Sequence, residues 1–202
     1  MQYDFGKATP SGFERTGFLN SPPTILLKAV AKLRADHIKR KCRFLKYASK
    51  LNDLPTFARV NTGLDILFQA DYNHVGGATC EQCSRVRMVD WKPRIEEAVV
   101  HYGTIVSGNQ VVRDATERDG VNSELGGILC FEMEAAGLMN DFPCLVIRGI
   151  CDYADSHKNK RWQAYAAGTA AAYAKEVLSA IPTVNVVKLR TTNEIIRENQ
   201  GS

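Results

Sequence analysis

Two short runs of the sequence end in acidic side chains that follow apolar residues. The first is Cys130-Phe131-Glu132-Met133-Glu134 and the second is Arg148-Gly149-Ile150-Cys151-Asp152. In an open α/β sheet, the carboxyl ends of buried strands form the crevice in which ligands bind. Because an unpaired buried charge is costly, carboxylates at such a place need a partner. A sugar whose hydroxyls need acceptors, and a leaving group that needs a proton, would both provide one.

The elements that must position these carboxylates lie in the second half of the chain. Apolar runs predict three strands, over residues 98–106, 127–131 and 143–150. The remaining segments predict helices over 112–120, 134–139 and 162–181. Alternation of strands and helices predicts an α/β fold, a parallel-rich mixed sheet with crossover helices on both faces.

The first half of the chain is less regular. Residues 1–20 are rich in turn-forming residues and predict an irregular loop. A helix is expected after Ser21-Pro22-Pro23, where the serine can cap it, and a basic helix is expected over 38–51. Residues 53–97 have little periodicity and predict a long inserted loop, a kind of segment that often serves function.

Length and composition indicate a globular protein with one core. The chain has 202 residues and a formal charge of +4, which suit a single domain over residues 1–182. Within it we expect a variable part over 1–97 and an α/β core over 98–182, followed by a linker or tail over 183–202. With no secretory signal or bilayer-spanning run, we predict a cytoplasmic or other intracellular location and no membrane partner.

The basic excess is concentrated between Lys39 and Lys50. We interpret this run as a solvated helix face, because no aromatic platform or recognition motif accompanies it. A nucleic-acid patch and the attraction of polyphosphate substrates remain alternatives, and no specific nucleic-acid partner is predicted.

The six cysteines predict free thiols rather than disulfides in a reducing compartment. Cys80 and Cys83 have the spacing of a zinc knuckle, but no second pair follows and His74 is the only nearby imidazole. A structural zinc site needs four ligands, so we predict no metal and interpret both cysteines as surface or packed thiols. Metal binding by this pair remains the alternative.

Two further polar residues flank the second acidic run. His157 lies in a polar loop, which favours a solvated histidine, although with Lys158 and Lys160 it could instead contact a substrate phosphate. Arg148 is expected to be structural and paired beneath the site rather than catalytic.

Three motifs together resemble a known superfamily. Ser107-Gly108-Asn109, Phe131-Glu132-Met133-Glu134-Ala135 and the run from Arg148 to Asp155 resemble, in order and spacing, the purine and uridine phosphorylases. Within that superfamily they look most like methylthioadenosine/S-adenosylhomocysteine nucleosidases. The resemblance covers residues 98–181. The remainder is similar to the variable part of a fungal branch whose members occur alone or fused to receptor-type ATPases.

The resemblance implies a role for each matched residue. Asp152 would be the catalytic acid that protonates or hydrogen-bonds purine N7 as the glycosidic bond breaks. Glu134 would accept hydrogen bonds from the ribose hydroxyls, with Met133 against the sugar. The other implied substrate-binding residues are Phe131, Glu132, Ser107, Asn109, Val111 and Val112, the two valines lying where the family stacks the base. Asn109 stands where the family usually has an aspartate, and Cys151 where it has a serine.

The function implied is cleavage of the N-glycosidic bond of a purine nucleoside or nucleotide, by hydrolysis rather than phosphorolysis. The resemblance implies no cofactor, with inorganic phosphate as co-substrate if the protein is a phosphorylase, and it implies a homo-oligomer. The alternative is a non-catalytic nucleotide-sensing or interaction module, or a truncated inactive fragment. The strand and glycine-rich loop that open the family's domain have no counterpart after Met1, so a water-activating base is unassigned. An exposed sheet edge is then expected, with a partner chain or poor stability.

Overall fold

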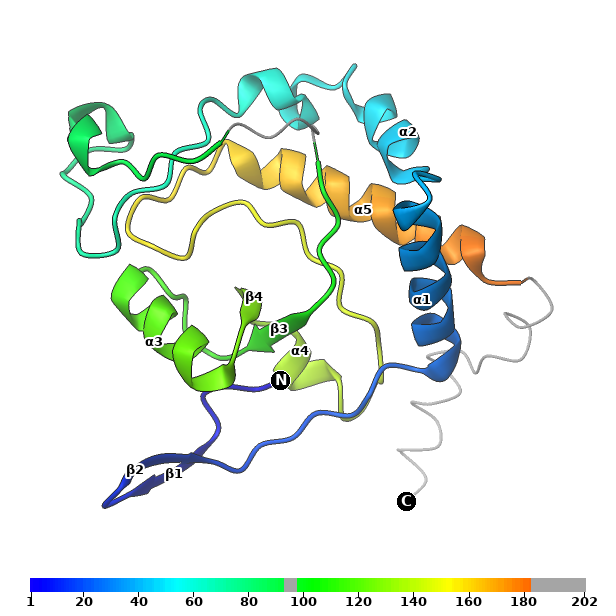
Figure 1. Ribbon diagram of the computed structural model, residues 1–202, viewed down its shortest axis with the longest axis horizontal. Helices are drawn as coiled ribbons and strands as arrows, with labels where there is room; N and C mark the ends of the chain where they lie inside the picture. The colour runs from blue at the N-terminus through cyan, green and yellow to red at the C-terminus, as the bar shows by residue number, and fades with distance from the viewer. Residues whose placement is uncertain (93–97, 183–202) are drawn as a thin grey trace.

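The computed structural model describes residues 1–92 and 98–182. Two groups of elements face each other across a central space (Figure 1). One group contains the helices α1 (Thr24–Ile38), α2 (Phe44–Ala48) and α5 (Trp162–Ala180). The other contains β3 (Thr104–Ser107), α3 (Ala115–Leu125), β4 (Ile128–Glu132) and α4 (Ala135–Leu138).

The strands β3 and β4 form a parallel pair in which Ser107 lies opposite Glu132. The crossover between them is α3, which begins after Asp114 because that carboxylate accepts hydrogen bonds from the N–H groups of Thr116 and Glu117. It ends at Gly126, whose φ of 72° is left-handed. The predicted α/β class and the parallel crossover are thereby confirmed, with a helix shifted from the expected 112–120.

The wider sheet expected from the sequence is not present among the described residues. Residues 143–150 form no strand, and of the expected strand over 98–106 only the end from Thr104 pairs. Both expectations rested on apolar runs, but a strand also needs a neighbour for its backbone groups. No backbone–backbone hydrogen bond joins 98–103 or 143–150 to other described residues.

The first twenty residues are more ordered than expected. A hairpin forms from β1 (Gly6–Thr9) and β2 (Gly12–Arg15), with a left-handed Gly12 at the turn, so the predicted irregular loop was wrong. Before it, Gln2 bridges Ser107 in parallel, and the Tyr3 N–H donates to Ser107 O at 3.0 Å. Tyr3 is thereby buried beside Val106 and Val112, and this segment extends the β3–β4 pair.

Two details of the helical half differ from the prediction. The N-cap of α1 is Pro23, without a side-chain cap, so Ser21 does not cap this helix. The helix expected over 38–51 is broken at Arg40, whose φ is 57°, and continues as α2 and a 3₁₀ turn, η1 (Ser49–Leu51). The cause is tertiary: the Glu176 carboxylate accepts the Arg43 N–H at 2.6 Å, and Phe44 enters the core.

The helix α5 is the centre of the larger core. It confirms the helix expected over 162–181, and its small residues let other segments approach closely. A Cβ atom at Gly149 would overlap the carbonyl oxygen of Ala166, so the segment before Asp152 lies directly against this helix. The core residues shared by α1, α2 and α5 are Ala29, Leu33, Phe44, Tyr173, Val177 and Ile181.

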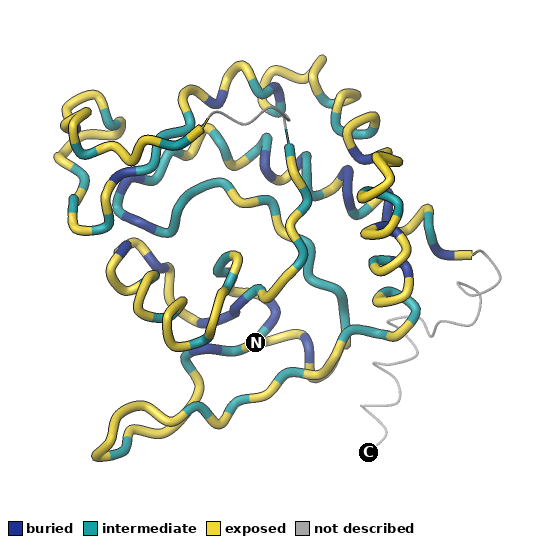
Figure 2. Tube along the Cα trace, in the orientation of Figure 1, coloured by how far each residue is buried: buried dark blue, intermediate teal, exposed yellow. Residues whose placement is uncertain are grey.

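The segment from Asp53 to Lys92 has no α-helix and no extended strand, in agreement with the predicted inserted loop. Its elements are four 3₁₀ turns, η2 (Pro55–Phe57), η3 (Arg59–Asn61), η4 (Cys80–Gln82) and η5 (Arg85–Arg87). Phe68 and Met88 form one antiparallel bridge across it. Much of the segment is exposed (Figure 2). Among the described residues, no helix combines the length and apolar character that crossing a bilayer requires.

Candidate functional site

The two groups of elements line a cavity of about 2040 Å³ that is partly open to solvent. Its wall includes residues 98–103 and 145–150, Ile105 of β3, the strand β4, residues 110–113, and the loop that carries Asp152. Ligand pockets usually measure roughly 300–1,000 Å³, so this cavity has room for a nucleotide and more.

The cavity wall contains six of the nine residues singled out from the sequence: Asp152, Phe131, Glu132, Met133, Val111 and Val112. Three do not line it: Ser107, Asn109 and Glu134. The end of β4 and the second acidic run therefore line one cavity, whereas the end of β3 and Glu134 do not.

Asp152 is held in a tight turn by its own side chain. Its Oδ1 accepts the Ala154 N–H at 2.9 Å, and Ala154 has a φ of 53°. The other oxygen, Oδ2, lies 3.4 Å from Lys158 Nζ and 3.5 Å from Cys151 Sγ. Lys158 is thus the charged neighbour of Asp152. Ile150, two residues before Asp152, is 47% exposed.

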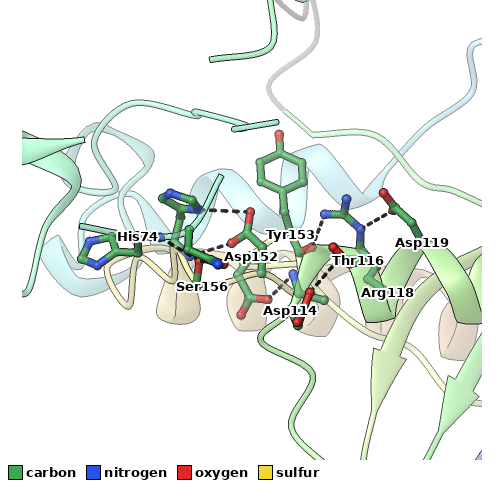
Figure 3. A network of polar contacts seen from close by, with 12 residues as sticks. His74, Asp114, Thr116, Arg118, Asp119, Asp152, Tyr153 and Ser156 are labelled. Carbon is green, nitrogen blue, oxygen red and sulfur yellow. Dashed lines mark hydrogen bonds and ion pairs between the residues drawn. The ribbon is translucent and has the colours of Figure 1, made fainter. Parts of the chain in front are cut away.

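The loop after Asp152 is hydrogen-bonded to two different segments, as Figure 3 shows. From α3, Arg118 Nη1 donates to Tyr153 O at 2.8 Å. From the inserted loop, the His74 N–H donates to Ser156 Oγ at 3.0 Å. The Tyr153 hydroxyl also donates to Asp65 at 2.7 Å. Asp152 therefore sits on a loop whose backbone is positioned by α3 and by the inserted loop together.

Glu132 is 3% exposed and binds backbone. Its Oε2 accepts the N–H groups of Glu134 and Ala135, both at 2.9 Å, at the start of α4. Burial raises the pKa of this carboxyl, but hydrogen bonds from Ser107 and these two N–H groups outweigh it and leave the pKa below its ordinary value. Ser107, itself fully buried, accepts the Ala136 N–H at 2.9 Å. Both residues shape the turn after β4.

Glu134 and Met133 are the exposed residues of this turn. The Glu134 side chain is 69% exposed, and its Oε2 lies 3.5 Å from Arg148 Nη1. Arg148 is accordingly paired, as the sequence predicts. Met133 is 43% exposed and lines the cavity.

The two valines after β3 face different surroundings. Val111 is 55% exposed on the cavity wall, whereas Val112 is 5% exposed and belongs to the core around Val106. Asn109 is exposed, and its backbone N–H donates to Asp4 Oδ2. The sequence offered no signal for Asp4, because its partner lies far along the chain.

His157 contradicts the expected solvated histidine, because its side chain is only 3% exposed. The ring stacks on Phe68, with centroids 4.1 Å apart, and also on Tyr72. Burial lowers the pKa of this imidazole, an effect that outweighs the neighbouring Asp155 carboxylate. The signal that we missed is the pair Phe68 and Tyr72. These aromatic residues lie in a segment that we interpreted only as a loop, and they cover the His157 ring.

Trp162 lies where α5 meets the cavity, and it is one of the residues of the wall. The Arg59 guanidinium carbon lies 4.2 Å from the centroid of its ring, a cation–π contact that joins the inserted loop to the helix.

Within residues 1–92 and 98–182, two clusters contain side chains of the types that bind metals. One contains His37, Cys42 and Glu176, and the other contains His74, Cys80 and Cys83. In the first, His37 Nε2 is 3.1 Å from Glu176 Oε2, and His37 Nδ1 is 3.1 Å from the Tyr102 hydroxyl, so its nitrogens already have partners.

Comparison with known proteins gives two kinds of relative. A nucleotide-binding leucine-rich repeat (NLR)-like protein of the fungus Hyaloscypha variabilis is 47% identical over 183 residues, which are 90% of this chain and 18% of that protein. The 5'-methylthioadenosine/S-adenosylhomocysteine nucleosidases of Mycobacterium bovis and Mycobacterium tuberculosis are 30% identical over 90 residues. That match covers 42% of this chain and 35% of each nucleosidase.

The chain thus spans well under half the length of each of these relatives. No family model matches it, and no solved structure matches it. The partial similarity to nucleosidases supports a relationship to nucleoside phosphorylase-like proteins, and the NLR-like relative is compatible with a module that also occurs fused to receptors.

Proposed function

We propose that the protein cleaves the N-glycosidic bond of a purine nucleoside or nucleotide and releases the base. The observation that carries the proposal is that Asp152 lines the same cavity as Phe131, of β4, and Met133, of the turn after β4. The partial similarity to nucleosidases supports the same chemistry. Because those relatives bear the name of hydrolases, hydrolysis is proposed over phosphorolysis.

In the proposed reaction the protonated Asp152 carboxyl gives its proton to purine N7 as the bond between N9 and ribose C1′ breaks. Water then adds to C1′, and the proton that the water loses restores the Asp152 carboxyl group. Loss of a purine anion is slow, and general acid catalysis of this kind contributes roughly 10²- to 10⁴-fold. Met133 and Val111 supply apolar surface for the sugar and the base on the same wall. Cationic character that develops on the ribose would be stabilised by nearby carboxylates, of which Glu134 is the proposed one.

Lys158 is relevant to the choice of substrate. Its ammonium is the ionic partner of Asp152 Oδ2 at 3.4 Å. A purine that contacts Asp152 through N7 therefore has to displace the Lys158 ammonium from this carboxyl group. An ammonium released in this way is available to a substrate phosphate, which favours nucleotides among the purine substrates. Arg161 and Lys160 line the same part of the wall.

A nucleotide-sensing module is the second candidate function. Glu134 is largely exposed and lies outside the cavity wall, so of the two proposed carboxylates only Asp152 faces the cavity. The chain also matches 18% of a much longer protein that is named as nucleotide-binding and NLR-like, so the matched part is a fraction of a larger molecule. In this case the cavity would bind the nucleotide without breaking it.

The test is incubation of the purified protein with adenosine, methylthioadenosine, AMP or ATP, with and without inorganic phosphate, followed by chromatography of free adenine. Adenine released without phosphate supports the nucleosidase. Release only with phosphate identifies a phosphorylase, and binding by calorimetry without release identifies the sensor.

The variant Asp152→Asn tests the proposed acid. We expect loss of turnover by about 10²-fold or more with ligand binding retained, because the amide cannot supply the proton. The matched control is Asp141→Asn, the same change at an exposed position outside the cavity wall, which should leave turnover unchanged. Full activity of Asp152→Asn would exclude the assigned acid.

A further inference from the structure

The inserted loop brings three metal-binding side chains together at the edge of the cavity. His74, Cys80 and Cys83 each offer one ligand atom, and these atoms all lie within 4.8 Å of one another. Tetrahedral zinc sites hold thiolates at about 2.3 Å and imidazoles at about 2.0–2.1 Å from the metal, so neighbouring ligand atoms lie about 3–4 Å apart. The three side chains are thus close to the spacing that a single ion requires.

The backbone between them is bent in a way that presents both cysteines to one point. Gly76 and Gly77 have φ values of 54° and 77°, left-handed conformations that turn the chain back after His74. Cys80 then begins the 3₁₀ turn η4, and the Cys83 N–H donates to Cys80 O at 3.1 Å. This turn places the two sulfur atoms on the same side.

The His74 ring is already oriented by a second hydrogen bond. Its Nε2 lies 3.1 Å from the carbonyl oxygen of Thr79. A carbonyl accepts only from a protonated nitrogen, so Nε2 carries the proton and Nδ1 keeps a free lone pair. Zinc-binding histidines usually have this arrangement, with the second ring nitrogen donating to a carbonyl or carboxylate.

Another imidazole, that of His157, lies near this cluster on the loop that carries Asp152, although its nitrogens are not within 4.8 Å of all three ligand atoms. The His157 side chain is 3% exposed, and neither of its ring nitrogens has a hydrogen-bond partner. A buried imidazole without a partner is costly and rare. Its ring centroid lies 5.6 Å from that of His74. Two imidazoles on one zinc ion place their centroids about 5 Å apart, given Zn–N bonds of about 2.1 Å.

Asp155 completes the arrangement around His157. Its Oδ2 lies 3.7 Å from His157 Nδ1, and its Oδ1 accepts the His157 N–H at 2.8 Å. A small movement of the ring would give an Asp–His pair in which Nδ1 donates to the carboxylate and Nε2 is left for the metal, as in many zinc sites.

We propose that His74, Cys80, Cys83 and His157 bind one structural zinc ion. Two thiolates and two imidazoles are a donor set that zinc prefers, and four protein ligands close the site to substrate. The ion would link the inserted loop, which contains His74, Cys80 and Cys83, to the loop of Asp152, which contains His157. Sequence reasoning predicted no metal because only three donors are near one another in the chain, and the fold adds the fourth.

The first test is the metal content of freshly purified wild-type protein, by plasma mass spectrometry, with X-ray absorption at the zinc edge. We expect one zinc per chain, with two sulfur and two nitrogen neighbours. A metal-free protein with a Cys80–Cys83 disulfide overturns the proposal. A zinc ion coordinated by only one imidazole overturns the four-ligand site. These readouts do not depend on base release, so the proposed enzyme can fail while the zinc site stands.

The second test uses variants. Cys80→Ser and Cys83→Ser should each lose the bound zinc, and Asp155→Asn should weaken zinc binding about 10- to 100-fold in competition with a chromogenic chelator. The matched control is Cys42→Ser, because Cys42 belongs to the cluster whose histidine is already hydrogen-bonded. Retention of one zinc in Cys80→Ser, or its loss in Cys42→Ser, contradicts the assignment. If a serine variant does not fold, the absorption spectrum of the wild-type protein decides.

Discussion

The carboxylate of Glu132 accepts two backbone N–H groups at the start of α4, within the turn that presents Met133 to the cavity. Charge-assisted hydrogen bonds of this type are stronger than neutral ones, and those to an ionised group contribute about 1.5–3 kcal/mol each. Glu132 therefore has a structural task at the strand end, in addition to the substrate contact that the resemblance implies for it.

The variant Glu132→Gln should lower the free energy of unfolding at neutral pH by about 1–2 kcal/mol, because the neutral amide accepts the two N–H groups less strongly. The folded-state pKa of Glu132 lies below the ordinary 4.5, so its stabilisation is complete above pH 4.5 and is lost as the pH falls through the folded pKa. The difference between wild type and variant should therefore shrink in acid, as urea titrations at several pH values would measure.

The control is Glu124→Gln, whose side chain is 61% exposed beside Arg15. An exposed ion pair contributes little, so its difference from wild type should be small at every pH. Unchanged stability of Glu132→Gln together with a raised KM would contradict the structural role and favour direct substrate contact.

At this scale the sequence predicted the positions of some residues better than their surroundings. Asp152 was singled out from its position after an apolar run and Met133 from the family resemblance, and both line the cavity. The burial of His157 could not be foreseen, because it depends on Phe68 and Tyr72, which no local pattern relates to it. The placement of Lys158 against Asp152, in a loop where Ala154 is left-handed, is another feature without a sequence signal.

Among the elements, α5 and the segment before Asp152 make a close backbone contact. Gly149 lies against the backbone of Ala166, and a Cβ atom at this position would overlap the Ala166 carbonyl. The contact sets the distance between the Asp152 loop and the helix.

Gly149→Ala should therefore destabilise the protein by about 2 kcal/mol or more, as overpacking against backbone does, and should also reduce any activity that depends on Asp152. Thermal unfolding followed by circular dichroism measures the first effect. Gly120→Ala is the matched control: it lies within α3 with open space around it, and should stabilise by about 0.5–1 kcal/mol. Equal melting temperatures for the two variants would contradict the close approach.

The helices α1 and α5 are joined by a buried polar contact. Glu176, 2% exposed, accepts the Arg43 N–H and lies 3.1 Å from His37 Nε2. A carboxylate at this place holds the break between α1 and α2 in position, which is why the basic segment does not form the continuous helix expected from its sequence.

Glu176→Ala should cost about 2–4 kcal/mol in the free energy of unfolding, since it leaves buried donors without a partner. Chemical denaturation gives this value directly. The same change at Glu124, in an exposed pair with Arg15, should cost less than about 1 kcal/mol. A small effect at Glu176 would mean that α1 and α5 are held by their apolar contacts alone.

Element prediction succeeded where local pattern and environment agree. The alanine-rich helix ends within a residue of its expected limit, and α3 and β4 differ from prediction by a few residues. Prediction failed for 143–150, because an apolar run does not specify whether a neighbouring strand exists. It failed for the hairpin over Gly6–Arg15, whose strands are short and mostly exposed. The expected tail over 183–202 lies outside the described residues.

On the scale of the whole molecule, two small cores stand on either side of the cavity. One surrounds α5 and the other surrounds Tyr3, Val106 and Val112. The segments 98–103 and 143–150 connect the two groups and have no backbone partner among the described residues. Such an arrangement leaves strand-like apolar segments ready to pair with additional strands.

Amide hydrogen exchange should distinguish these segments from the paired strands. We expect fast exchange over 98–103 and 143–150 and slow exchange over β3 and β4, because only the latter have cross-strand hydrogen bonds. Mass spectrometry of peptic fragments measures this at several protein concentrations. Slow exchange that appears only at high concentration would indicate pairing with a second copy, and slow exchange at every concentration would contradict the unpaired arrangement.

The contact between Arg59 and Trp162 has a practical consequence. The chain has two tryptophans, and the indole of Trp162 lies on the cavity wall beneath a guanidinium. A ligand that enters there changes the polarity and the charge around this ring, so intrinsic fluorescence should respond to binding without any added dye. Replacing Trp91 by phenylalanine would leave Trp162 as the sole tryptophan, and its fluorescence, excited selectively over the tyrosines, would then report occupancy of the cavity.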